Sequence, residues 1–156
     1  MSSLLHQEIE SKIQGRIEEG NYIDIPFSIT ENIKQPLRDY QNKALENFIY
    51  FMQINKKYQA LENKHLLFHM ATGSGKTNII ASTILYLYEK GYRDFIFFVN
   101  TQNIITKTKE NLLNKYSLKY LFNEQIIINN KEINVNEITD TFDVYKKDDI
   151  NILFTT

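Results

Sequence analysis

The stretch "TGSGKT", Thr72 to Thr77, has the composition of a phosphate-binding loop. A phosphate chain carries several negative charges, and backbone N–H groups at the amino end of a helix bind it well because the helix dipole also favours an anion there. Glycine keeps side chains out of that approach, lysine adds a mobile positive charge for the β and γ phosphates, and a threonine hydroxyl can ligate Mg²⁺. We therefore predict a nucleotide site at Thr72, Gly73, Ser74, Gly75, Lys76 and Thr77, with catalytic roles for Lys76 and Thr77 and a Mg²⁺ ligand at Thr77.

The segments on either side of this loop must hold it between a strand and a helix. Residues 64–70, "KHLLFHM", are a short apolar run that predicts a strand, and residues 76–90 predict an apolar helix that ends at Gly91. Met70 stands where the P-loop (Walker A) template G-x-x-x-x-G-K-[ST] has its first glycine. The alternative is a flexible helix-entry loop with a chance lysine, and the predicted strand and helix favour the nucleotide site.

The rest of the chain after the loop continues this alternation of strands and helices. Residues 94–100 predict a buried strand, residues 102–116 a helix, and residues 149–156 a last strand. Residues 124–135 predict two short strands around an Asn129–Asn130 turn. The pattern predicts an α/β fold with a central parallel sheet and right-handed crossovers.

The chain before the loop predicts two helices and an arm. Apolar residues recur every four positions from Leu5 to Ile17 and predict an N-terminal helix that ends near Gly20. Residues 22–30 alternate around Pro26 and predict an extended arm or edge strand. Residues 36–55 predict a second helix, whose buried face would be Leu37, Tyr40, Ala44, Leu45, Phe48, Ile49 and Met52.

Composition limits the classes of protein to consider. The 156 residues suffice for one domain, and a formal net charge of -1 means that any contact with nucleic acid must be local. The absence of cysteine excludes disulfides and thiolate metal sites and favours an intracellular compartment. The sequence has no signal-peptide core and no apolar stretch of membrane-spanning length, so we expect a soluble cytoplasmic protein.

Three stretches resemble the first RecA-like domain of helicase superfamily 2, the DEAD/DEAH-type proteins, and most of all the Res (motor) subunit of type III restriction enzymes. "MATGSGKT" is similar to motif I of that branch, "PLRDYQNKAL" to its upstream glutamine motif, and "FIFFVNTQNII" to its motif Ia. The resemblance implies a P-loop NTPase, a partial RecA-like domain at residues 35–156 in which a central parallel sheet is flanked by helices. Residues 1–34 would precede it as an N-terminal helix and arm.

The resemblance also implies how the base is recognised. Gln41 would bind adenine, because one amide can accept a hydrogen bond from the N6 amine and donate one to N7. Its alternative is an exposed polar position on an amphipathic helix. Arg38 would support the same pocket by stacking or by binding a phosphate, and a solvated arginine is the alternative.

Contacts with nucleic acid are implied at the ends of two strands. Asn100 and Thr101 follow the strand of motif Ia, and Thr155 lies where the family has motif Ib. An N-cap for the next helix is the other interpretation of Thr101. The lysines in the region are typical of a solvated helix face, with nucleic-acid binding as the alternative: Lys107, Lys109, Lys115 and Lys119. His65 and His69 lack further ligands, so we expect no metal beyond the Mg²⁺ of the nucleotide.

Hydrolysis in this superfamily also needs a D-E-x-H or D-E-x-D motif after an apolar strand, and the sequence contains none. Asp148 and Asp149 precede a strand and are expected in a turn. We therefore expect a fragment, inactive alone, of an ATP- and Mg²⁺-dependent DNA motor of a type III restriction endonuclease, with double-stranded DNA and a methyltransferase (Mod) subunit as partners. A general DEAD/DEAH-box DNA or RNA helicase is the first alternative. A P-loop phosphotransferase or a non-catalytic nucleotide-binding module is the second.

Overall fold

A computed structural model describes residues 5–19, 23–58, 65–139 and 148–156 of the chain. The chain divides into two compact units. The first unit comprises Met1–Ile25 and Leu37–Ser74, and the second comprises Pro26–Pro36 and Gly75–Thr156. The division between the units falls after Ser74, within the sequence "TGSGKT".

The first unit contains two long helices, α1 (Leu5–Glu18) and α3 (Asp39–Tyr58). The four-residue spacing predicted α1, and Ile9 and Ile13 of that stripe pack against Tyr50 of α3. The predicted second helix is confirmed, but it begins at Asp39 instead of Pro36. Leu45 and Ile49 are fully buried as expected.

Tyr40 was predicted on the buried face of this helix, and that prediction is wrong because the residue is 44% exposed. It occupies the first turn of α3, where its hydroxyl donates a hydrogen bond to the carbonyl of Ser74. The phenol of Tyr40 is therefore held by a hydrogen bond at the surface and does not pack in the core.

The strand predicted before the phosphate loop does not form. Residues 65–70 have no regular secondary structure, and Leu67 is 91% exposed. A central parallel strand needs hydrogen-bonding neighbours along its edges, and no described segment pairs with these residues. An apolar composition alone was not enough to make the strand.

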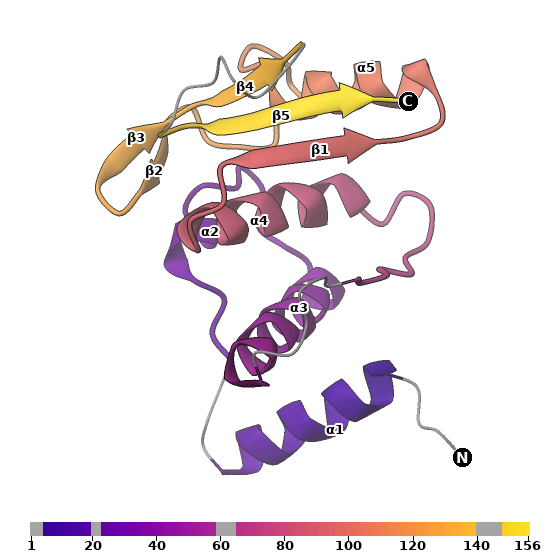
Figure 1. Ribbon diagram of the computed structural model, residues 1–156, viewed down its shortest axis with the longest axis vertical. Coiled ribbons are helices and arrows are strands. Elements are labelled where there is room, and N and C mark those ends of the chain that lie inside the picture. The colour runs from indigo at the N-terminus through magenta and orange to yellow at the C-terminus, as the bar shows by residue number, and fades with distance from the viewer. Residues whose placement is uncertain (1–4, 20–22, 59–64, 140–147) are drawn as a thin grey trace. The chain divides into compact units, whose positions relative to one another are not determined.

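The second unit is built on a parallel sheet. Helix α4 (Lys76–Glu89) is followed by strand β1 (Asp94–Phe98), and helix α5 (Gln102–Leu112) follows that strand. The sheet has the order β1-β5-β4, and in Figure 1 its three strands lie side by side and point the same way. The predicted α/β class with a parallel sheet is confirmed, whereas α5 ends four residues before the predicted end at Tyr116.

The remaining strands are short. Strands β2 (Ile126–Ile128) and β3 (Lys131–Ile133) form the predicted hairpin, and β5 (Ile150–Thr155) is the predicted last strand. Both turn residues have positive φ, 53° at Asn129 and 61° at Asn130, as a type I′ turn requires. Strand β4 (Val135–Ile138) was not predicted, and it pairs in parallel with β5.

Residues 26–36 belong to the second unit. They include a one-turn helix, α2 (Phe27–Thr30), where the sequence predicted an extended arm. Ile29 and Ile33 are buried in the core, and the buried amide of Asn32 donates to the carbonyls of Ser28 and Ile127 and accepts from the N–H of Ile127. The burial of these apolar side chains and the amide bonds favour the compact turn over an extended strand. None of the helices in the described parts is long and apolar enough to cross a membrane.

Candidate functional site

The loop enters α4 through a glycine in the left-handed conformation. Gly75 is the N-cap residue with φ 78° and ψ 36°, and as a glycine it has no side chain that could cap the helix. A residue with a Cβ would be strained there, so glycine allows the sharp entry. Lys76 is the first residue of α4 and is exposed, and Thr77 follows it half-buried. A lysine in the first turn of a helix that starts from a glycine turn fits an anionic ligand such as a phosphate chain, because the helix dipole favours negative charge there.

The preceding part of the loop is a tight turn in the first unit. Gly73 is also left-handed, with φ 78°. The backbone N–H and the hydroxyl of Ser74 both donate to the carbonyl of Ala71, at 3.3 Å and 2.7 Å. Thr72 and Gly73 lie exposed at the tip of this turn. The turn is closed on itself by Ser74, whereas its tip faces solvent.

The first turn of α3 is bonded to this same loop. The Nε2 atom of Gln41 donates to the Ser74 carbonyl at 3.0 Å, and the hydroxyl of Tyr40 donates to the same carbonyl at 2.9 Å. Arg38 donates from Nη1 to the Tyr40 hydroxyl at 3.0 Å. Arg38, Gln41 and Ser74, predicted separately, therefore lie together, and Tyr40 is a member of the group that the sequence did not reveal.

Gln41 also stabilises its own helix. Its Oε1 atom accepts a hydrogen bond from the backbone N–H of Arg38 at 2.9 Å, which is the reach of a glutamine at the third helical position back to the N-cap. Gln41 is only 3% exposed, so the alternative of an exposed position on an amphipathic helix is wrong. Adenine recognition by this residue stays a prediction.

A hollow of about 380 Å³ adjoins the Ser74 end of the loop. Its walls come from the first turns of α3 and from the segment that leads into the loop: Tyr40, Ala44, His69, Met70, Ala71 and Ser74. The lining is mostly apolar with a few polar atoms, which is the usual character of a small-molecule site. Met70 and Tyr40 therefore lie at a place where an organic ligand could rest.

The predicted nucleic-acid residues gather at one edge of the sheet in the second unit. Phe98 pairs with Thr155 in register, and the N–H of Val99 donates to the Thr155 carbonyl at 3.2 Å. Asn100 and Thr101 follow directly and are exposed. Thr101 is the N-cap residue of α5, but its side chain makes no capping hydrogen bond. The sequence separated these residues by more than fifty positions, and the parallel pairing brings them together.

Most of the lysines of this region are engaged by other side chains. Lys109 pairs with Glu137, Lys119 with Glu110 at 3.2 Å, and Lys115 donates to Asn134. The hydrogen bonds from Lys119 and Ser117 hold the pKa of Glu110 below its usual value. These ion pairs agree with the interpretation of a solvated helix face.

The acidic pair before β5 lies at the amino end of that strand. Asp149 is buried and accepts hydrogen bonds from the N–H of Asn134 and from Asn136. Asp148 pairs with Lys131 at 2.7 Å, and this contact lowers its pKa. Asp149 therefore joins β5 to the start of β4, and Asp148 joins it to β3, at the opposite end of β5 from Thr155. The described residues contain no group of three or more His, Asp or Glu that could hold a metal ion.

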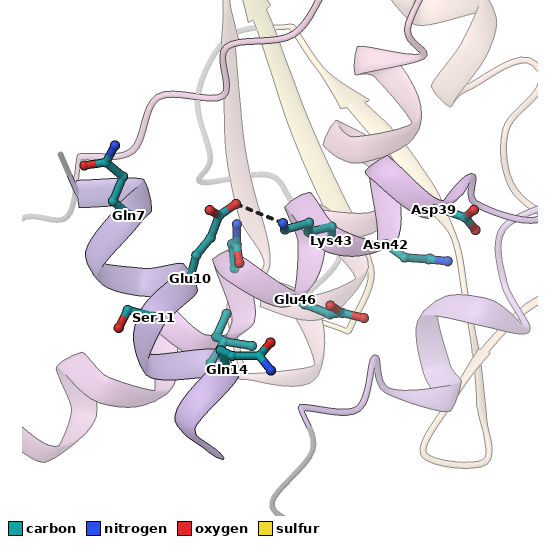
Figure 2. Close-up of a pocket in the computed structure, with 10 residues that line it drawn as sticks. Gln7, Glu10, Ser11, Gln14, Asp39, Asn42, Lys43 and Glu46 are labelled. Atoms are coloured by element: carbon teal, nitrogen blue, oxygen red, sulfur yellow. Dashed lines mark ion pairs between the residues drawn. The ribbon is translucent and has the colours of Figure 1, made fainter. Parts of the chain in front are cut away.

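A larger hollow, of about 710 Å³, lies between α1 and α3 and contains no predicted nucleotide-binding residue. Figure 2 shows that its lining is polar and that Glu10 and Lys43 form an ion pair across it, with Oε1 and Nζ 3.0 Å apart. Both side chains are substantially exposed. We interpret this groove as a solvated helix–helix boundary, since a salt bridge and polar side chains already fill its wall.

Comparisons with known proteins place this chain in a family. Residues 34–156 match the family described as "Type III restriction enzyme, res subunit". The chain is also 40% identical over 144 residues to the probable type III restriction-modification enzyme HindVIP Res subunit of Haemophilus influenzae. That alignment covers 90% of this chain and 28% of the length of the relative. No solved structure matches the chain at a comparable level of significance. With the "TGSGKT" loop at the start of α4 and the parallel sheet behind it, the chain belongs to the family of type III restriction enzyme res subunits.

Proposed function

We propose that this chain is the ATP-binding part of a DNA-dependent ATPase motor of a type III restriction endonuclease. The observation that carries the proposal is the entry into α4, where left-handed Gly75 is followed by Lys76 and Thr77 at the amino end of the helix. Family membership selects a motor among the many proteins that use such a loop. The complete subunit would hydrolyse ATP and act on DNA.

Each predicted residue has a place in that function. Thr72, Gly73, Ser74 and Gly75 would surround the phosphate chain, Lys76 would neutralise its β and γ phosphates, and Thr77 would hold Mg²⁺. When bound, Mg²⁺ would neutralise charge between the phosphates.

The base would be recognised by residues of α3 and of the turn before it. Gln41 would bind adenine and Arg38 would support it. In the described structure both residues contact the group around Ser74, which is the reason to place the base at this side of the loop.

Double-stranded DNA is the proposed partner of the sheet edge. Asn100, Thr101 and Thr155 would donate hydrogen bonds to phosphates, which position a strand without selecting its sequence. The relative's name describes it as a subunit of a restriction-modification enzyme, so a methyltransferase (Mod) subunit is the proposed protein partner. We propose the cytoplasm as its location.

The decisive test replaces the lysine of the loop. We expect Lys76→Ala to weaken binding of a fluorescent ATP analogue by at least about tenfold, because a charge-assisted contact to phosphate is lost. The control is Lys12→Ala on α1, which removes the same exposed charge from another helix. Equal affinity of the Lys76→Ala variant and the unmodified chain would rule out the phosphate-loop assignment. In the complete subunit, an ATPase rate that is unchanged by added DNA would rule out the proposed motor function.

A further inference from the structure

We propose that Tyr40 is a positioning residue for the phosphate loop and that it acts whichever base the nucleotide carries. The inference rests on the proposed function, since it concerns the same nucleotide site. It starts from Ser74, the last residue of the first unit.

The carbonyl of Ser74 is held by two donors from one helix turn. The Tyr40 hydroxyl lies 2.9 Å from it and Gln41 Nε2 lies 3.0 Å from it. A carbonyl oxygen has two lone pairs, so α3 occupies both. The N–H and the hydroxyl of Ser74 are bonded to Ala71, which leaves this residue little freedom to rotate.

Fixing this carbonyl fixes the peptide that leads into Gly75. The peptide unit is planar, so the direction of the Ser74 carbonyl sets the plane of the whole link between the two residues. Gly75 is the N-cap residue from which α4 starts. A donor to the Ser74 carbonyl therefore fixes the plane of the peptide N–H of Gly75, which is one of the backbone groups of the phosphate loop.

The two donors differ in what else they can do. Gln41 is an amide that the proposed function assigns to adenine, so its bond to Ser74 competes with the base. The Tyr40 hydroxyl has a single proton, which it gives to Ser74, and it accepts a hydrogen bond from Nη1 of Arg38 at 3.0 Å. A guanidinium donor polarises the phenol and strengthens its bond to Ser74. The relay from Arg38 through Tyr40 would hold the loop while Gln41 turns to the base.

The test compares three ligands with a substitution that removes one oxygen. Tyr40→Phe keeps the ring and loses the hydroxyl. We expect it to weaken the binding of ATP, GTP and inorganic tripolyphosphate by the same factor, about tenfold. Gln41→Ala should instead weaken the binding of ATP more than the binding of GTP or tripolyphosphate. Tyr116→Phe is the matched control, because Tyr116 is 99% exposed, and it should leave all three affinities unchanged.

The outcomes separate this inference from the proposed function. If Tyr40→Phe loses affinity for ATP alone, Tyr40 recognises the base. If all three affinities are unchanged, Tyr40 has no role in binding. Either result overturns the inference. If Lys76→Ala binds as well as the unmodified chain, the proposed function itself falls. Titrations are made well below the unfolding transition of every variant, so that a loss of stability in Tyr40→Phe leaves the folded fraction, and with it the comparison of the three ligands, unchanged.

Discussion

Polar residues at the Ser74 turn and polar residues at the edge of the sheet are arranged in opposite ways. At the turn, Tyr40 and Gln41 donate to a carbonyl of the protein itself, and Gln41 is almost completely buried. At the edge, Asn100 and Thr101 are exposed, and the Thr101 side chain makes no capping bond. The first region has its geometry set before any ligand arrives, whereas the second offers groups to a ligand that has yet to bind.

This difference tells where a substitution should affect stability and where it should affect binding alone. A residue that bonds to its own protein contributes to folding, so its loss lowers the free energy of unfolding as well as the affinity. An exposed residue without such a bond contributes little to folding. Three substitutions test the comparison, in order of decreasing effect on the free energy of unfolding.

The largest effect is expected for Gln41→Ala. It removes the bond to Ser74 and leaves the N–H of Arg38 without its capping acceptor, so the free energy of unfolding should fall by about 2 kcal/mol. Urea denaturation measures this loss, and nucleotide titration should show ATP weakened more than GTP. Gln41→Met, which keeps the volume without the hydrogen bonds, should recover part of the stability but none of the preference for ATP. Equal losses for ATP and GTP would contradict the adenine role.

A smaller effect is expected for Gly73→Ala. The glycine has φ +78°, and a Cβ there would have no heavy atom within 4 Å, so the cost is backbone strain of about 1 kcal/mol and not a clash. Gly73→Asn should cost less, because asparagine tolerates the left-handed region better than alanine. Urea denaturation of the two variants gives the comparison. A greater loss for asparagine would show that space, and not backbone conformation, limits this position.

The smallest effect on folding is expected for Thr101→Ala. No capping bond is lost, so the free energy of unfolding should change by less than about 0.5 kcal/mol. In the complete subunit, the stimulation of ATP hydrolysis by DNA should nevertheless fall several-fold, and Thr155→Ala should act in the same way. Ser117→Ala is a control away from this edge, since Ser117 follows α5 and its hydroxyl donates to Glu110 of that helix. A large loss of stability in Thr101→Ala with unchanged DNA stimulation would reverse our distinction between the two regions.

Two apolar segments show what the sequence could and could not predict about the fold. Residues 94–98 became a strand as predicted, and residues 65–70 did not, although both are rich in Leu, Ile and Phe. The first has β5 beside it in register, and the second has no described partner. Local composition predicts a tendency, and long-range pairing decides whether the strand forms. The hairpin was predictable because asparagine tolerates a positive φ, and both central residues of the turn, Asn129 and Asn130, have one.

The site was predictable to the extent that its chemistry is local. The loop "TGSGKT" and the helix after it are consecutive, so the motif predicted the start of α4 at Lys76, but it did not predict the left-handed conformation of Gly73 and Gly75. Tyr40 could not be assigned, because helical periodicity places it on an apolar stripe and only the fold brings Ser74 within reach of its hydroxyl. Glutamine at the third helical position was a signal for the capping role of Gln41, which the sequence analysis did not use.

The place of residues 26–36 in the second unit has a consequence for the time course of folding. Asn32 and Ile127, which are bonded in the folded chain, are 95 positions apart in sequence. Synthesis proceeds from the amino end, and a helix of four residues such as α2 is not stable alone. The bonds between Asn32 and Ile127 can therefore form only after β2 has left the ribosome. In synchronised synthesis sampled by brief protease digestion, residues 26–36 should become protected late, at the same time as residues that are made long after them.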